Sequence, residues 1–356
     1  MSQPGEDEPA RRPGTAPIVD RHRLDEAALA RWLARHLPGY EGPLAVRQFE
    51  GGQSNPTYHL LAPSGEYVLR KQPPGKLLPS AHAIDREYRI LQALAGSDVP
   101  VPRARTYCED ASILGTPFYV MDYCAGRIFT DPLLPGLAVA ERAAIYDAMN
   151  AALARLHLFE WRGGVLADFG RAEHYFARQI ARWGKQYDAS RSDDVPAMDA
   201  LRAWLETHIP DDDQATIAHG DFRIGNLIFD AAKPQVVAIL DWELSTIGHP
   251  MSDLAFNCMT YHLPAGHPIC AGFVGVDIDA LGIPSEARYL DAYADRTGRD
   301  ARTHWNFFMA FSLFRIAAIQ QGVYARALQG NAASRIAHLF GESYRIVADA
   351  GRRLIE

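Results

Sequence analysis

Residues 219–226 read His-Gly-Asp-Phe-Arg-Ile-Gly-Asn, and this stretch decides how the rest of the chain is interpreted. Asp221 and Asn226 lie five positions apart in it, on what has the composition of a short loop. Asp241 follows the apolar run 236–240, which predicts a buried strand. Two carboxylates and an amide oxygen suit a hard cation such as Mg²⁺, which prefers oxygen ligands and keeps substrate phosphates in its shell. One carboxylate can bind the metal while the other accepts a proton, a division of labour that phosphoryl transfer requires.

The spacing of these residues is also that of a kinase. Asp221 and Asn226 keep the Asp-x-x-x-x-Asn spacing of a kinase catalytic loop, and Asp241 stands where the aspartate of Asp-Phe-Gly would stand. The loop reads His-Gly-Asp instead of His-Arg-Asp, and residues 241–243 read Asp-Trp-Glu. With these departures the chain resembles the aminoglycoside phosphotransferase and choline kinase-like family of small-molecule kinases. It looks most like the kinase-like domain found beside acyl-CoA dehydrogenase domains, over nearly the whole chain after about Leu24.

The resemblance implies a role for each residue of the motif. Asp221 is expected to be the catalytic base, and the expected Mg²⁺ ligands are Asn226, Asp241 and Glu243. ATP is the expected phosphate donor. The alternative is that Asp221 caps a turn and Asp241 ends a strand. Three ligand types in kinase order favour the functional interpretation, although motif matches carry a false-positive risk.

A glycine-rich turn is the first candidate for phosphate binding. It separates expected strands at 44–50 and 57–61 and reads Gly-Gly-Gln-Ser-Asn. Glycine adds no side chain and tolerates positive φ, so backbone N–H groups can approach phosphate oxygens closely. The turn resembles the phosphate-covering loop of these kinases, although it lacks the full G-x-G-x-x-G and an ordinary hairpin is the alternative. The candidate residues are Gly51, Gly52, Ser54 and Asn55.

A strand cation should contact the nucleotide phosphates. In the expected strand 66–71, Arg70 and Lys71 point to opposite faces because side chains alternate. The family pattern places Arg70 at the position of the usual lysine, with Lys71 as the alternative, and the residue not used is expected to be a solvated charge. Glu87, on an expected helix that Ser80 caps and that runs to about residue 95, is the preferred partner of the cation, and Asp85 is the weaker choice.

The segment after the next strands resembles the hinge of a kinase. Strands are expected at 105–109 and 116–123, and the second ends in Met-Asp-Tyr-Cys-Ala-Gly. The resemblance implies that backbone groups of Met121 and Tyr123 pair with adenine. A strand ending in a glycine turn explains the same residues without a ligand.

A helix is expected to begin near Asp253, where a carboxylate is favourable at a helix N-terminus. The resemblance gives Asp253 a structural role, bracing the backbone of the catalytic loop. Residues 248–250 read Gly-His-Pro, whereas many relatives have Gly-Asp-Pro. The run 211–213, Asp-Asp-Asp, is interpreted as a solvated turn and not a metal site.

The expected fold is α+β and two-lobed like a protein kinase. A small antiparallel β lobe with one helix should precede a larger, mostly helical lobe. The expected division is a flexible leader at 1–22, a nucleotide-binding lobe at 23–122, and a catalytic and acceptor-binding lobe at 123–356. Expected helices in the larger lobe are 137–157, one starting near 171, 198–208, 285–298, 304–329 and 332–355.

Composition excludes several classes of function. A net charge of −7 gives no basic footprint for nucleic acid. Four cysteines without C-x-x-C spacing are interpreted as reduced thiols. No apolar run approaches the length of a membrane span, and the first 22 residues lack a signal-peptide core, so a cytoplasmic location is expected.

The sequence thus predicts an ATP- and Mg²⁺-dependent phosphotransferase acting on a hydroxyl of a small molecule. Polycationic aminoglycosides are the weaker substrate, because the expected acceptor loop 260–284 contains only Asp277 and Asp279 as acids. By analogy with the dehydrogenase-linked relatives, a hydroxy acid or hydroxyacyl thioester is preferred, and so is an association with enzymes of acyl-CoA metabolism. A nucleotide-binding pseudokinase is the alternative. Dehydrogenase activity is less favoured, because no G-x-G-x-x-G opens a βαβ unit.

Overall fold

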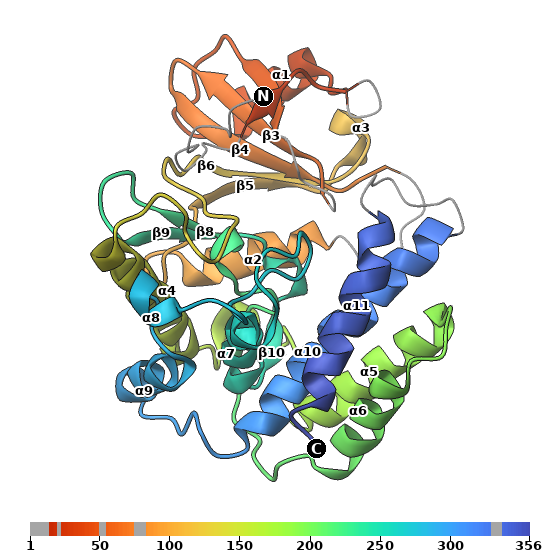
Figure 1. The fold of residues 1–356 in the computed structure, drawn as a ribbon. Coiled ribbons are helices and arrows are strands. Elements are labelled where there is room, and N and C mark those ends of the chain that lie inside the picture. The colour runs from red at the N-terminus through yellow and green to blue at the C-terminus, as the bar shows by residue number, and fades with distance from the viewer. Residues whose placement is uncertain (1–13, 20–22, 50–54, 75–82, 329–336) are drawn as a thin grey trace, which may run out of the picture. The chain divides into compact units, whose positions relative to one another are not determined.

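The computed structural model describes residues 14–19, 23–49, 55–74, 83–328 and 337–356 (Figure 1). Its contacts divide the chain into two compact units. The first unit contains 1–129, 161–169 and 226–245, and the second contains 130–160, 170–225 and 246–356. Each unit is thus built from segments that are distant in the sequence.

A six-stranded antiparallel sheet forms the centre of the first unit. In sheet order its strands are β1 (Thr15–Ala16), β2 (Ala45–Phe49), β3 (Thr57–Ala62), β4 (Gly65–Lys71), β6 (Phe118–Asp122) and β5 (Ala104–Cys108). The β1 strand lies inside the predicted leader 1–22, where it pairs with Phe49 and Gln48 of β2. An edge strand presents unpaired N–H and C=O groups, so β1 satisfies part of the outer edge of β2.

Alternation along the strands sorts the residues of the sheet onto two faces. One face packs against α1 (Glu26–His36), whose N-cap Asp25 accepts the N–H of Ala28. The buried cluster there includes Leu29, Trp32, Leu33, Tyr58, Leu60, Leu69, Phe118 and Val120. The other face carries Arg70 and Tyr119, which pair across β4 and β6. The helix α2 (Ile84–Leu94) supplies Glu87 to this second face, whereas its predicted cap, Ser80, lies outside the described residues.

A smaller hairpin completes the first unit. It consists of β8 (Leu227–Phe229) and β9 (Val236–Ile239), which pair antiparallel, and the strand predicted from the apolar run 236–240 is confirmed. Backbone hydrogen bonds join Arg127 and Phe229 in both directions, at 2.7 and 2.9 Å. A Cβ on Gly126 would lie 2.2 Å from the Phe229 oxygen, so this position requires glycine. The remaining short elements are α3 (Ala111–Leu114), η2 (Gly164–Leu166), η3 (Ile224–Asn226), which ends at the boundary between the units, and η4 (Trp242–Leu244).

The second unit is mostly helical (Figure 1). Its helices are α4 (Val139–Leu158), α5 (Tyr175–Ser190), α6 (Pro196–Thr207), α7 (Pro250–Cys258), η5 (Met259–His262), α8 (Ile278–Leu281), α9 (Glu286–Thr297), α10 (Trp305–Leu328) and α11 (Ala337–Arg352). A two-stranded ladder joins β7 (Thr216–Ala218) to β10 (Thr246–Gly248). The long α10 is buried over most of its surface and packs against α5, α6, α7 and α11.

Several expectations about this unit need correction. The helix expected from about Arg171 begins at Tyr175. A Cβ on the preceding Gly170 would lie 2.6 Å from Thr246 Oγ1 and 2.7 Å from the Ile247 nitrogen, so contact with β10 confines the chain there. The segment 260–284, expected to be irregular, contains the end of η5 and the whole of α8.

Two further observations concern the cysteines and the apolar helices. All four cysteines are free thiols. Among the residues that the structure describes, no helix has both the length and the apolar character that crossing a bilayer requires.

Candidate active site

Arg70 and Glu87 form a buried ion pair in the first unit. The guanidinium Nε lies 3.2 Å from Glu87 Oε2, and Nη2 lies 3.3 Å from Asp241 Oδ1. The Arg70 side chain is 12% exposed and that of Glu87 is 1% exposed. The pairing of Arg70 with Glu87 that the resemblance implied is therefore present, and Asp85, the weaker candidate, is exposed.

Two further side chains complete the hydrogen bonding of Glu87. The Asn55 amide donates to Oε1 at 3.0 Å, and the Tyr119 hydroxyl donates to Oε2 at 2.9 Å. A buried carboxylate is tolerated only when its lone pairs are satisfied in this way. Tyr119 did not appear among the predicted site residues. Its position opposite Arg70 in the antiparallel register was the available signal, and it depends on a strand pairing that local periodicity does not contain.

The surrounding charges hold Arg70 in its cationic form. Burial disfavours the charged guanidinium, but the neighbouring Glu87, Tyr119, Asp241 and Glu243 outweigh that effect and raise its pKa. A permanently charged planar donor suits phosphate oxygens. The geometry thus presents one fixed cation that is shared between a helix carboxylate and the carboxylate of Asp241.

We predicted that whichever of Arg70 and Lys71 is not used for phosphate binding would be a solvated charge. For Lys71 this prediction is wrong. The residue is only 8% exposed, and alternation puts it on the same sheet face as Leu69, which belongs to the buried cluster with α1. Burial lowers the pKa of its ammonium group.

Replacing Glu87 by Gln should destabilise the protein strongly. The variant keeps the shape of the side chain but leaves Arg70 with one carboxylate fewer in a buried environment. Removing one partner of a buried ion pair costs about 3–5 kcal/mol. Urea unfolding should show this loss, whereas Tyr119→Phe, which removes one hydrogen bond to the same carboxylate, should cost about 1 kcal/mol. Equal stabilities of the two variants would show that the ion pair contributes no more than a hydrogen bond.

The candidate metal ligands lie at one end of the β8–β9 hairpin. The N–H of Leu240 donates to the Asn226 carbonyl at 2.8 Å, so the turn into the hairpin and the exit from it are adjacent. Asp241 follows directly, in a left-handed conformation with φ of 67° that non-glycine residues rarely adopt. The Asp241 side chain is 34% exposed, and Glu243 lies two residues later, in η4.

This donor set fits a hard cation. Asn226 and Asp241 supply an amide and a carboxylate at the same end of the hairpin, and Glu243 adds a second carboxylate nearby in the sequence. Oxygen ligands of this kind are those that Mg²⁺ prefers, with the remaining positions left for phosphates and water. Across the described residues, no group of three His, Cys, Asp or Glu side chains is arranged to hold a metal. A metal site here would therefore need the amide oxygen of Asn226 or the phosphates of the nucleotide as further ligands.

The structure bears differently on the other residues that were predicted to bind the nucleotide. Gly51, Gly52 and Ser54 lie outside the described residues. Met121 is buried within β6. The N–H of Tyr123 donates to the Glu66 carbonyl at 3.2 Å, so an adenine contact through this N–H would have to replace a hydrogen bond of the sheet. The adenine roles of Met121 and Tyr123, and a phosphate role for Asn55, stay predictions.

The catalytic loop carries Asp221 in the second unit. The Asp221 side chain is 23% exposed, and one of its oxygens lies 3.5 Å from Nε of Arg223. Its backbone N–H donates to Nδ1 of His219 at 3.1 Å. Gly220, between them, has φ of 83°. Glycine adopts this region without the cost that a side chain imposes, which accounts for His-Gly-Asp where kinases have His-Arg-Asp.

Asp253 braces this loop, as the resemblance implied. Its two carboxylate oxygens accept the backbone N–H groups of His219 at 2.5 Å and of Gly220 at 2.8 Å. His157 Nε2 lies 3.4 Å from the same carboxylate. Burial alone would raise the pKa of Asp253, but the hydrogen bond and charge of His157, with those from the loop, lower it.

His249 explains the Gly-His-Pro departure. It is the N-cap of α7, and its Nδ1 accepts the N–H of Met251 at 3.2 Å. Its Nε2 lies 3.3 Å from Asp212, so the acidic run 211–213 is not merely a solvated turn. Burial is the main cause that lowers the pKa of His249 to about 4. The histidine is therefore neutral near pH 7 and acts as a structural cap.

Stability should fall as the pH drops from about 6.5 to about 4. The unfolded chain binds a proton at His249 in this range while the folded protein does not, so the contribution is present above pH 6.5 and is lost on acidification. Its size is at most about 3 kcal/mol. His249→Asn keeps a cap acceptor but cannot titrate, so its unfolding free energy should depend less steeply on pH over this range. An unchanged slope in this variant would show that the acid sensitivity comes from other groups.

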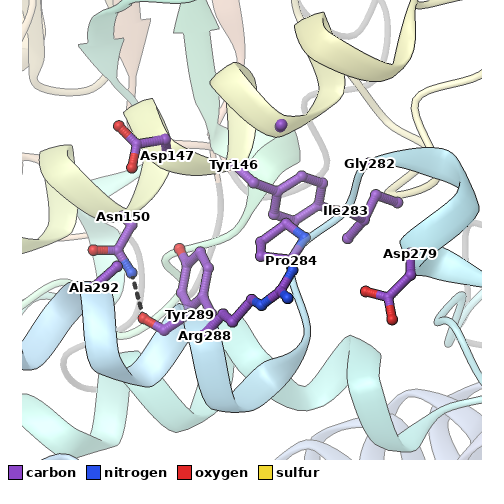
Figure 2. Close-up of a pocket in the computed structure, with 11 residues that line it drawn as sticks. Tyr146, Asp147, Asn150, Asp279, Gly282, Ile283, Pro284, Arg288, Tyr289 and Ala292 are labelled. Atoms are coloured by element: carbon purple, nitrogen blue, oxygen red, sulfur yellow. Dashed lines mark hydrogen bonds between the residues drawn. The ribbon is translucent and has the colours of Figure 1, made fainter.

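A pocket of about 400 Å³ opens elsewhere in the second unit (Figure 2). Residues of α4, α8, α9 and the 282–284 segment line it, and none of the predicted catalytic, nucleotide-binding or metal residues is among them, whereas Asp279 of the expected acceptor loop is. Figure 2 shows Asn150 hydrogen-bonded to the Tyr289 carbonyl, at 2.8 Å. The Tyr289 hydroxyl donates to Asn257 at 2.6 Å, and Asn257 donates to the Phe222 carbonyl at 3.4 Å. The wall of the pocket is thus linked to the catalytic loop.

Comparison with known proteins identifies the family of this chain. A family model described as "Phosphotransferase enzyme family" matches residues 45–305. Acyl-CoA dehydrogenase family member 10 of Mus musculus is 46% identical over 338 residues, which cover 95% of this chain and 32% of that protein. The chain therefore spans about a third of the length of this relative.

Solved structures show the same fold. A protein from Ralstonia eutropha, assigned provisionally as an aminoglycoside phosphotransferase, is 46% identical with a TM-score of 0.85, covering 93% of this chain and 98% of that one. A thermostable mutant of an aminoglycoside phosphotransferase, in ternary complex with AMP-PNP and hygromycin B, has a TM-score of 0.59 at 14% identity, covering 92% and 98%. At that identity the likeness concerns the fold alone. The two-lobed kinase-like α+β fold is confirmed, and the chain belongs to the phosphotransferase enzyme family.

Proposed function

We propose that this protein transfers the γ-phosphoryl group of ATP to a hydroxyl of a small molecule. The observation that carries the proposal is the array of Arg70, Glu87 and Asp241, a buried cation shared between two carboxylates. Phosphoryl transfer depends mainly on positioning and charge neutralisation, and this array is a prepared set of charges. The neighbour that binds AMP-PNP supports the choice of an adenine nucleotide.

Each residue then has a stated role. Arg70 contacts the nucleotide phosphates, and Glu87 fixes its guanidinium. Asn226, Asp241 and Glu243 would hold Mg²⁺, which would neutralise phosphate charge. Asp221 accepts a hydrogen bond from the acceptor hydroxyl, orients its oxygen and takes its proton as the phosphoryl group transfers.

For the acceptor we propose a hydroxy acid or hydroxyacyl thioester, and we propose an association with enzymes of acyl-CoA metabolism in the cytoplasm. The name of the mouse relative supports the link to acyl-CoA chemistry. Aminoglycosides remain the weaker substrate, because Asp277 and Asp279 are the only acids between residues 260 and 284. A pseudokinase without turnover is the rival, and the presence of Asp221, Asn226 and Asp241 counts against it.

The test is an acceptor screen. The purified protein is incubated with ATP, Mg²⁺ and a metabolite extract, and mass spectrometry follows the gain of one phosphate by a hydroxylated compound. Asp221→Asn protein is the control. We expect a product with the parent protein alone. Nucleotide binding without any product across extracts would favour the pseudokinase, and a flavin absorbance spectrum would instead point to a dehydrogenase.

A further inference from the structure

The backbone on either side of Asp221 is held by side chains from two helices. Asp253 of α7 accepts the N–H groups of His219 and Gly220. One helical turn later, Asn257 donates to the Phe222 carbonyl at 3.4 Å. Residues four apart on a helix share a face, so both contacts come from one side of α7. The peptide group between Gly220 and Asp221 depends on a different helix.

That different helix is α10, and its side chain in contact with the loop is Arg315. Its Nη2 donates to the Gly220 carbonyl at 2.5 Å. The other end of the same peptide group, the Asp221 N–H, donates to His219 Nδ1 at 3.1 Å. Both polar atoms of the peptide plane that precedes Asp221 are thus engaged, and a plane held at both ends has little freedom to rotate.

The environment of Arg315 is unusual for a cation. The residue is 5% exposed, and its guanidinium lies over the rings of Trp183 and Phe256, at 5.5 and 5.4 Å from their centroids. Within the described part of the chain it forms no ion pair with a carboxylate. Burying a charge without an opposite charge is costly, and aromatic faces recover only part of that cost. Holding the loop carbonyl with a buried arginine is therefore unfavourable for the stability of the fold.

We infer that Arg315 is a positioning residue for Asp221. It fixes the Gly220–Asp221 peptide plane and so the direction in which the Asp221 carboxylate leaves the loop. Its effect on turnover rests on the proposed function, whereas its effect on the loop does not. A 1 Å displacement of a reacting group can cost about 100-fold in rate, so a brace of this kind has a measurable role.

Hydrogen exchange tests the brace without any substrate. Amide exchange of the peptide covering 217–225 is measured by mass spectrometry in the full chain, for the parent, Arg315→Met and Arg315→Lys. We expect exchange in this peptide to be roughly tenfold faster in Arg315→Met, the size expected when a hydrogen bond to a charged group is lost. Arg315→Lys keeps a cationic donor, so it should lie between the two.

A matched control separates the brace from general stability. Gln320→Met changes a buried residue of the same helix and removes its hydrogen bond from Ser343, at 2.8 Å. It should leave exchange in 217–225 unchanged relative to the rest of the second unit. Parent-like exchange in Arg315→Met, or acceleration no greater than that of peptides throughout the unit, would overturn the assignment.

The kinetic measurement uses an acceptor found by the screen. Arg315→Met should lower kcat by roughly 10- to 100-fold with the KM for ATP unchanged, since misplacing the base affects the chemical step. A rise in KM at constant kcat would contradict the positioning role. If the parent transfers no phosphate at all, the proposed function fails, and the exchange measurement still decides whether Arg315 holds the loop.

Discussion

Asp221→Asn is expected to reduce phosphoryl transfer by about 10²–10⁴-fold, the usual contribution of a positioned acid or base. The amide keeps the shape of the side chain and one acceptor oxygen but removes the charge that takes the hydroxyl proton. Asp221 is 23% exposed, and its loop is braced through neighbouring backbone groups, so folding should survive the change. Initial rates with the acceptor from the screen measure the effect.

Asp211→Asn is the matched control for this experiment. It makes the same chemical change at an exposed carboxylate of the second unit and should keep the parent rate. Thermal unfolding and ATP titration of both variants exclude a folding or nucleotide-binding defect. A parent-like rate in Asp221→Asn would show that Asp221 is not the base, and the kinase interpretation of residues 219–226 would lose its centre.

Asp241→Ala is expected to abolish the Mg²⁺ dependence of nucleotide binding. Changing a residue that only supports a metal ligand costs about 10- to 100-fold in metal affinity, so loss of a direct ligand should cost at least that much. Calorimetric titration of ATP with and without Mg²⁺ measures the difference. Folding should be affected less, because the Asp241 side chain is 34% exposed and Arg70 retains Glu87.

The control for Asp241→Ala is Asp168→Ala, which removes an 80% exposed carboxylate from the same unit. It should bind ATP and Mg²⁺ as the parent does. If Asp241→Ala binds nucleotide with parent affinity under both conditions, then Asp241 is not a metal ligand. Arg70 would then stand as the phosphate contact without support from a cation at this end of the hairpin.

Local signals in the sequence were sufficient for the framework of the site. The His-Gly-Asp and Asp-Trp-Glu motifs located Asp221 and Asp241, and alternation along residues 66–71 separated Arg70 from Lys71. The strand β9 was also predicted from an apolar run, and so was the position of Asp253 at the start of a helix. Each of these depends on residues a few positions apart, where backbone geometry alone decides which side chains share a face.

Tertiary structure decided the contacts between distant segments. Lys71 is buried on the sheet face that packs against α1, and Tyr119 reaches Glu87 because β6 pairs with β4. Gly170, shortly before α5, lies close against β10, a contact between distant segments that local periodicity does not contain.

Arg315 is the clearest case of a contact that only the fold reveals. It lies 95 positions from Gly220 in the sequence, on a helix that is mostly apolar. The motifs alone therefore predicted which groups would carry the chemistry. The fold decided which residues hold those groups in place, because such contacts arise only when elements far apart in the chain pack together and leave no periodic signal in either segment.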